Sequence, residues 1–229
     1  MRSALAVGDV LRRSSLLHDV HGDTLDELVR ASRTRHLERG AVFILEGDEP
    51  TSVFVVADGL MRVFTTSFDG TEPTLTVLFP GDLVGELGVL DETIRSASVG
   101  ALRPSAVIEI SGTDFRAAFE HDIAISRALV AHLSHRLRST SARLCDLTVL
   151  DLGARLAKYL ASEMTAGSAT PFVDLVFTQS ELGQLVGGAR QTVNQELAAM
   201  ERDGLITVRG RRIDVLDPAR LRRRAAHPV

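Results

Sequence analysis

Residues 85–97 read GELGVLDETIRSA. In this stretch Glu86 and Arg95 lie nine residues apart, between turns of small residues and inside an apolar, strand-like neighbourhood. A hairpin with a surface salt bridge would explain the pair. A second explanation is a site for an anion, because Gly85 lets the backbone approach a ligand, while Arg95 and Ser96 can donate hydrogen bonds to a phosphate. The surrounding sequence decides between the two.

The segment around this stretch predicts a small β-sandwich or jelly roll. Short β-branched runs alternate with Asp-Gly and Pro-Gly turns from about 36 to 110, which is typical of such folds. An amphipathic helix is predicted before them, at 23–32. The predicted strands are VFIL (42–45), VFVVA (53–57), LMRVFTTSF (60–68), TLTVLF (74–79), SASVGAL (96–102) and AVIEI (106–110).

From residue 113 onward the apolar period changes from two to seven, which predicts a long helix. Its a and d positions form a seam, and such a seam favours a parallel dimer with a second copy of the chain. The alternative is a helix packed on the jelly roll. Thr140 is the polar member of the seam, where it could fix the register or face a ligand. The seam residues are Val130, Leu133, Leu137, Thr140, Leu144 and Leu147.

A helix-turn-helix is predicted at 178–200, TQSELGQLVGGARQTVNQELAAM. Thr178 and Glu181 form the S/T-x-x-E pattern of a capping box, which starts a helix over 179–186. Gly187 and Gly188 supply a left-handed turn, and a second helix follows at 190–203. A helix is also predicted at 151–164, followed by a loop at 165–171.

The second of these two helices carries side chains that read bases. Arginine can pair with guanine O6 and N7, and glutamine or asparagine with adenine N6 and N7. The hairpin of GLITV and RRIDVL that follows, with its arginines, is suited to phosphate contact. The alternative is a helical hairpin with a polar face. The predicted DNA-contacting residues are Thr178, Gln179, Ser180, Ala189, Arg190, Gln191, Thr192, Asn194, Gln195, Arg209 and Arg211, with Arg212 beside them.

The order of these segments resembles the catabolite activator protein (CRP/FNR) superfamily of bacterial regulators. The resemblance covers about 16–217 and is most specific in GELGVLDETIRSA and ELGQLVGGARQTV. It implies an α+β chain with three parts. These are a cyclic-nucleotide-binding-like jelly-roll sensor domain at 1–122, a long dimerisation helix and hinge at 123–150, and a winged helix-turn-helix domain at 151–229.

The resemblance also implies cyclic AMP as an allosteric effector. Arg95 and Ser96 would hold the cyclic phosphate, and Glu86 the ribose 2′-hydroxyl. Thr140 would contact the adenine, together with Ser141 from the partner subunit, and Arg136 would pair with Glu86. Another nucleotide such as cyclic di-GMP, or no effector, is the alternative. The implied ligand-binding residues are Gly85, Glu86, Leu87, Arg95, Ser96, Arg136, Thr140 and Ser141.

The chain departs from the family pattern in two places. The loop between Glu86 and Arg95 is one residue shorter than in the best-known member, which bears on affinity for the ligand. In the recognition helix, Gln191 stands where the family has an acid, and Gln195 where it has a second arginine. An altered or relaxed DNA half-site is therefore predicted.

Composition narrows the class of protein further. With 45% hydrophobic and 24% charged residues, the chain of 229 residues is predicted to fold. Residues 1–150 carry 15 Arg against 21 Asp and Glu, whereas 151–229 carry 11 Arg and Lys against 9 acids, with the basic excess at 209–224. Double-stranded DNA and a second copy of the chain are the expected partners, with RNA polymerase implied by the resemblance.

Several functions are excluded by what the sequence lacks. Cys145 is the single cysteine, and neither a metal-ligand cluster nor a P-loop nor a nucleophile motif is found, so the chain is predicted to be neither a metalloprotein nor an enzyme. Members of the family that sense oxygen or carbon monoxide need cysteines or a haem histidine, and because no Cys or His lies between His36 and His121 the resemblance does not imply such sensing here. His18, His21 and His132 are interpreted as surface or interface residues. No apolar run reaches the ~20 residues of a membrane span, and a cytoplasmic protein without membrane contact is predicted.

Overall fold

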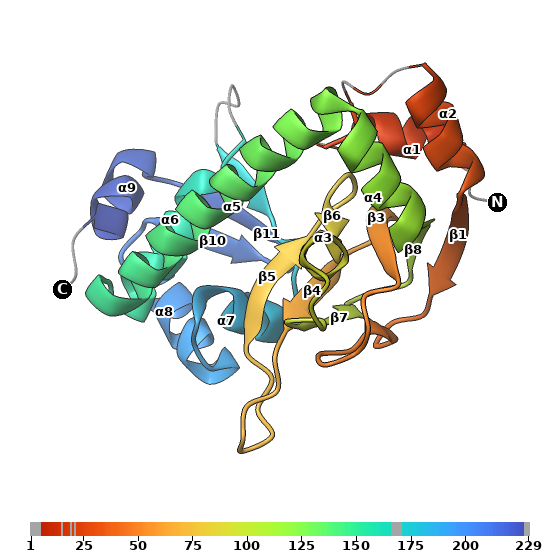
Figure 1. The fold of residues 1–229 in the computed structure, drawn as a ribbon. Helices are drawn as coiled ribbons and strands as arrows, with labels where there is room; N and C mark the ends of the chain where they lie inside the picture. The colour runs from red at the N-terminus through yellow and green to blue at the C-terminus, as the bar shows by residue number, and fades with distance from the viewer. Residues whose placement is uncertain (1–5, 15, 19, 21, 166–170, 227–229) are drawn as a thin grey trace. The chain divides into compact units, whose positions relative to one another are not determined.

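The computed structural model describes residues 6–14, 16–18, 20, 22–165 and 171–226. It divides the chain into two compact units, Met1–Arg136 and Leu137–Val229 (Figure 1). The division falls inside the long helix, because that helix supplies residues to both units. His21 and most of the predicted loop at 165–171 lie outside the described residues.

The first unit contains two four-stranded antiparallel sheets. All six predicted strands are present, although the structure trims LMRVFTTSF and SASVGAL to four residues each. The polar edge strand β1 and the two-residue β6 were not predicted. In sheet order the strands are β1 (Ser32–Leu37), β8 (Ser105–Ser111), β3 (Ser52–Asp58) and β6 (Leu83–Val84), and then β2 (Val42–Ile44), β7 (Ser98–Ala101), β4 (Met61–Phe64) and β5 (Thr74–Leu78).

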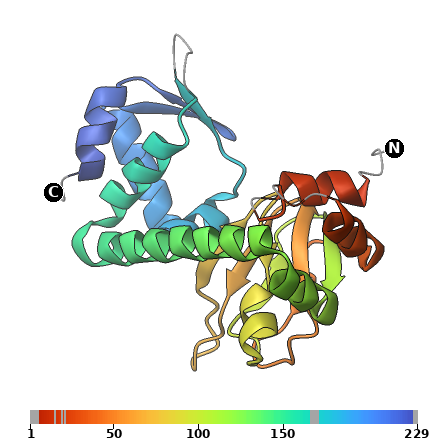
Figure 2. The ribbon, with the colours of Figure 1, turned by 45° about the horizontal axis from the view of Figure 1, so that its top comes forward.

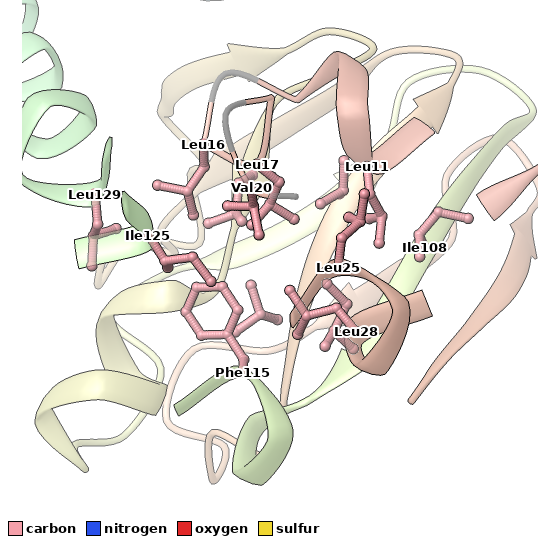
Figure 3. Close-up of a cluster of buried hydrophobic side chains, with 14 of the residues drawn as sticks. Leu11, Leu16, Leu17, Val20, Leu25, Leu28, Ile108, Phe115, Ile125 and Leu129 are labelled. Carbon is pink, nitrogen blue, oxygen red and sulfur yellow. The ribbon is translucent and has the colours of Figure 1, made fainter. Parts of the chain in front are cut away.

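Two apolar cores hold this unit together. One lies between the sheets and includes Phe54, Met61 and Val99. The other covers the opposite face of the β1-containing sheet, where Phe115 is fully buried among helical leucines (Figure 3). Its helices are α1 (Val7–Arg13), α2 (Asp23–Arg30), α4 (Gly112–His121) and the start of α5. Burial on the outer face of the sheet thus fixes where α5 begins.

The long helix predicted at 123–150 is present as α5 (Ile123–Val149), and the residues before it, from 112 to 121, form a separate helix, α4 (Figure 2). Asp122 is extended, and its Oδ1 accepts a hydrogen bond from the Ala124 N–H at 2.8 Å, as an N-capping residue does. Ile125 and Leu129 of α5 enter the second core. Five of the six seam residues are exposed, among them Val130 at 64%, Leu137 at 69% and Leu144 at 63%, whereas Leu133 is half-buried and packs against the second core.

The second unit is a helix-turn-helix with a three-stranded sheet of order β10-β11-β9. The predicted helices and the hairpin are confirmed within one or two residues. Strand β9 and helix α9 were not predicted. The elements after α5 are α6 (Leu152–Ser162), β9 (Phe172–Asp174), α7 (Gln179–Val186), α8 (Arg190–Arg202), β10 (Ile206–Arg209), β11 (Arg212–Val215) and α9 (Pro218–Ala226).

Candidate functional site

In the first unit, the stretch 85–97 forms a turn, a short helix and a loop after β6. Gly85 has φ 88°, a left-handed conformation that favours glycine, and α3 (Glu86–Asp91) follows directly. A Cβ at Gly85 would lie 2.8 Å from Arg95 Nη1 and 3.3 Å from the Ser52 carbonyl oxygen. Gly85 therefore makes room for the arginine at the other end of the stretch.

Arg95 is buried, with 6% of its surface exposed. Its Nη1 donates to the Gly85 carbonyl at 2.7 Å and its Nη2 to the Ser52 carbonyl at 2.5 Å. Burial lowers the pKa of Arg95, and the carboxylates of Glu86 and Asp48 act in the opposite direction. Since an arginine stays protonated in proteins, the chain holds a buried cation on neutral carbonyl groups, to which an anion can add.

Glu86 is fully buried. Its Oε1 accepts from Arg136 Nη1 at 2.9 Å, which is the ion pair that the resemblance implied. Its Oε2 is also buried and has no hydrogen-bond partner among the described residues. A buried carboxylate oxygen without a partner is costly, so this atom marks a place where a ligand hydroxyl would be stabilising.

These side chains surround one cavity of about 90 Å³. Six of the eight implied ligand residues line it, and the other two, Thr140 and Ser141, belong to the second unit, where they are exposed on α5. Apolar residues complete the wall, including Leu75, Val84 and Val99. The six are Gly85, Glu86, Leu87, Arg95, Ser96 and Arg136.

The helix-turn-helix in the second unit has the predicted start and turn. Thr178 Oγ1 accepts from the Glu181 N–H at 3.3 Å, and Glu181 Oε2 accepts from the Thr178 N–H at 2.8 Å. Gly187 ends α7 in the left-handed conformation, with φ 72°. The turn and the start of α8 pack closely on α7, since a Cβ at Gly183 would lie 2.6 Å from the Gly188 carbonyl oxygen and 3.4 Å from the Arg190 nitrogen. The recognition helix α8 is therefore held against α7 by backbone contact.

Most of the predicted base-reading residues are exposed on α8. Arg190, Gln191, Thr192 and Gln195 are exposed, and Val193 is buried. Asn194 differs from the prediction, because it is half-buried and its Oδ1 has no described hydrogen-bond partner. At 100° per residue, position 194 borders the stripe of Val193 and Leu197, so it lies on the flank of the helix. At the start of α7, Thr178 and Ser180 are exposed and Gln179 is half-buried; Ala189 before α8 is exposed.

The wing arginines are engaged by neighbouring groups. Arg209 Nε lies 3.3 Å and Arg212 Nε 2.7 Å from the carboxylate of Asp214. Arg211 donates to the Leu175 and Val176 carbonyls at 3.0 and 2.7 Å. Arg209 keeps 72% of its side chain exposed and is the wing arginine best able to reach a phosphate.

Comparison with known proteins identifies the two domains in which these residues lie. Residues 34–122 match the cyclic nucleotide-binding domain and residues 154–224 the Crp-like helix-turn-helix domain. The cAMP-activated global transcriptional regulator Vfr of Pseudomonas aeruginosa is 31% identical over 194 residues, 82% of this chain and 91% of its own. The chain belongs to the CRP/FNR family.

Two further comparisons bear on this CRP/FNR regulator. The CRP-like cAMP-activated global transcriptional regulator of Mycobacterium tuberculosis is 29% identical over 223 residues, 95% of this chain and 99% of its own. The solved structure of CLP, a c-di-GMP responsive global regulator of Xanthomonas campestris, has a TM-score of 0.69 and covers 85% of this chain and 98% of that one. At 22% identity, CLP shows the fold alone.

This family member is a DNA-binding transcription regulator with a nucleotide-binding domain, and not an enzyme. Family membership also supports dimerisation. Within the part of the chain that the structure describes, no helix is long and apolar enough to cross a membrane. No group of His, Cys, Asp or Glu within that part could hold a metal ion.

Two arginines donate hydrogen bonds to the carbonyl groups at the C-terminal end of α7. The sequence patterns had not suggested a role for either of them. Arg143 of α5 donates from Nη2 to the Leu185 carbonyl at 2.6 Å. Arg155 of α6 donates to the Val186 and Gly187 carbonyls at 2.8 and 3.1 Å. The last carbonyls of a helix have no partner within it, and these contacts supply partners. Their acceptors are backbone atoms, which no residue pattern reveals.

Replacing Arg143 with alanine is expected to destabilise the second unit by about 1.5–3 kcal/mol, because a charged donor to a part-buried carbonyl is lost. Tyr159 is the only tyrosine and tryptophan is absent, so tyrosine fluorescence during urea unfolding reports on this unit. Arg138→Ala, an exposed arginine on the same helix, is the control and should leave the midpoint unchanged. Equal midpoints for both variants would show that the Arg143 contact contributes nothing.

Proposed function

We propose that the chain is a homodimeric regulator whose binding to near-palindromic DNA responds to cyclic AMP. The observation that carries this proposal is the pairing, in one cavity, of a buried arginine held by two carbonyls with a buried glutamate that has an unpartnered oxygen. The two groups match the two polar ends of a cyclic ribose phosphate. The sensor half and the DNA-binding half then act as one allosteric protein.

The cavity chemistry assigns a role to each group. Arg95 binds the cyclic phosphate with charge-assisted hydrogen bonds, and Ser96 donates another. Glu86 Oε2 accepts from the ribose 2′-hydroxyl, while Arg136 neutralises the carboxylate so that it does not repel the phosphate. The polar groups that line the cavity match the phosphate and the ribose, so the sugar-phosphate end of the ligand is assigned to it.

The base is assigned to the dimer helix. Thr140 hydrogen-bonds the adenine, and Ser141 reaches it from the partner subunit, so ligand binding and the α5 seam are coupled. The cAMP-activated relatives in Mycobacterium tuberculosis and Pseudomonas aeruginosa, at 29% and 31% identity, support adenine as the base. Both residues are exposed on α5 and open to such contacts.

The response follows from differential binding. Cyclic AMP shifts the dimer toward its DNA-binding state only by binding that state more tightly. The hinge is placed at Leu147–Asp151, where α5 ends and α6 begins. Two recognition helices then enter successive major grooves about one helical turn apart. The dimer works in the cytoplasm, where its DNA target lies, and contacts RNA polymerase there.

Isothermal titration of the full chain tests the sensing half. We expect saturable binding of cyclic AMP at one site per subunit, and weaker binding of cyclic GMP because Thr140 and Ser141 are placed on adenine. Thr140→Ala should remove most of this preference. Binding heat with cyclic di-GMP and none with cyclic AMP would identify cyclic di-GMP as the effector. No heat with any of the three nucleotides would show that the chain binds DNA without a nucleotide effector.

The recognition helix predicts a changed half-site. Arg190 can bind a guanine, as the family's arginine does. Gln191 stands where the family has an acid and Gln195 where it has a second arginine, and both amides favour adenine. Each such contact contributes about 1–3 kcal/mol of discrimination between bases. Selection from random duplexes should therefore return a half-site that differs from TGTGA, the family's usual half-site, or tolerates changes in it. Gln195→Arg should restore a guanine at one position. Selection of unaltered TGTGA by the wild-type chain would refute the assignment.

A further inference from the structure

The C-terminal helix α9 carries more positive charge than its packing uses. Its nine residues, PARLRRRAA, include four arginines and no acid. Asp217 caps the helix, since its Oδ1 accepts from the Arg220 N–H at 2.9 Å, and Leu221 anchors it as a fully buried side chain. The helix is therefore a fixed part of the second unit, although the helix-turn-helix and the wing are complete before it.

Two of the four arginines attach α9 to the recognition helix. Arg220 Nη1 donates to the Asp203 carbonyl, just past the end of α8, at 3.2 Å. Arg224 Nη2 lies 3.4 Å from Glu196 Oε2, in the second turn of α8. A Cβ at Gly153 would lie 2.4 Å from both Arg224 Nη2 and Glu196 Oε2, so the glycine of α6 leaves space for this ion pair.

These two contacts set the direction of α9. It starts beside the C-terminal end of α8 and runs back toward the N-terminal end, which carries Arg190, Gln191 and Gln195. Glu196, the residue that Arg224 contacts, directly follows Gln195 in the sequence. Glu196 faces α6, so the C-terminal end of α9 lies beside the second turn of α8 and the first turn of α6, within the helix-turn-helix unit that is placed on DNA, where phosphates line both edges of the bound groove.

The other two arginines are free for an external partner. Arg222 and Arg223 are exposed, and neither forms an ion pair with any residue that the structure describes. We propose that Arg222 and Arg223 contact the DNA backbone beside the half-site, as a third phosphate-binding surface besides the helix-turn-helix and the wing. This proposal rests on the DNA binding of the family and on α8 as the recognition helix.

The chemistry of these two side chains favours a DNA phosphate as their partner over the edge of a base. Two adjacent exposed guanidinium groups on a fixed helix offer positive charge and hydrogen-bond donors to a phosphate. Base edges are read from within a groove, and it is α8 and not α9 that is placed there. Contacts of this kind raise affinity for all DNA sequences and make it depend steeply on salt. Arginines in a last turn also stabilise the helix dipole, but that effect acts on folding stability and leaves the salt dependence unchanged.

The test is the salt dependence of binding by the full-length dimer to one selected duplex. Each lost phosphate contact lowers the slope of log Kobs against log salt by about 0.9, so Arg222→Ala/Arg223→Ala should lower it by about 3.6 if both arginines in both subunits contact phosphate. Arg222→Lys/Arg223→Lys keeps the charge and should retain most of the slope. The control Arg13→Ala/Arg30→Ala removes two exposed arginines from the first unit and should leave the slope unchanged.

The outcomes separate this proposal from the function it rests on. If the wild-type chain fails to bind any duplex, DNA binding by this chain is refuted, whatever α9 does. If the wild type binds and the alanine variant keeps its full slope, only the α9 surface is refuted. An unchanged slope with a loss of transcription would likewise overturn it, and would assign Arg222 and Arg223 to a protein partner. A reduced slope with unchanged sequence preference is the expected result.

Discussion

Arg95→Ala is expected to weaken cyclic AMP binding roughly 100-fold or more. Two hydrogen bonds from a charged donor to the phosphate contribute about 1.5–3 kcal/mol each. The variant removes both of them, and it also removes the buried cation of the cavity wall. Titration calorimetry of wild type and variant measures the loss directly. If the variant binds cyclic AMP within a few-fold of the wild-type affinity, Arg95 does not bind the phosphate.

Two further variants separate binding from folding. Arg95 also holds the Gly85 and Ser52 carbonyls, so the alanine variant is expected to lose stability as well as affinity. Arg95→Lys keeps a point charge without the paired donors of a guanidinium and should bind with intermediate affinity. Arg103→Ala is the matched control, since Arg103 also donates to a backbone carbonyl of the jelly roll, that of Gly59, but does not line the cavity. It should bind cyclic AMP as the wild type does.

Aspartates in the α5 seam are expected to abolish the dimer. Leu137 and Leu144 are mostly exposed in the single chain, so Leu137→Asp/Leu144→Asp removes little from its own core. Burial of a leucine contributes about 1.5–3 kcal/mol. With four leucines in a dimer, the loss is about 6–12 kcal/mol, a drop of at least 10⁴-fold in the association constant.

Sedimentation analysis and DNA binding measure this effect together. The seam variant should sediment as a monomer and bind a palindromic duplex no more tightly than a single half-site. The control Ser139→Asp/Ala142→Asp places the same charges on exposed positions of α5 outside the seam. It should remain a dimer. A seam variant that stays dimeric would locate the subunit interface elsewhere in the chain.

Local patterns predicted much of this chain. The capping box of Thr178 and Glu181 and the left-handed turn at Gly187 involve neighbours in the sequence, so their chemistry was visible there. Strand β1 was not visible, because its sequence SRTRHL is polar and it is held by pairing with β8, whose residues are 68 to 78 positions away in the sequence. For α9, the Asp217-Pro218 start was a usable signal, but one leucine among four arginines forms no apolar stripe.

Some features of the candidate site were likewise visible in local sequence patterns, and others appeared only in the tertiary structure. Residue types and spacing alone determined that 85–97 brings a glutamate and an arginine to one turn, that α5 carries an a and d pattern of apolar residues, and that α8 presents Arg190 and Gln195. Only the tertiary structure decided that Glu86 keeps an unpartnered buried oxygen, that Asn194 turns to the flank, and that Arg143 and Arg155 end α7. The reason is physical: burial and backbone hydrogen bonding depend on segments that are distant in the sequence, whereas caps, turns and heptads depend on residues within a few positions of each other.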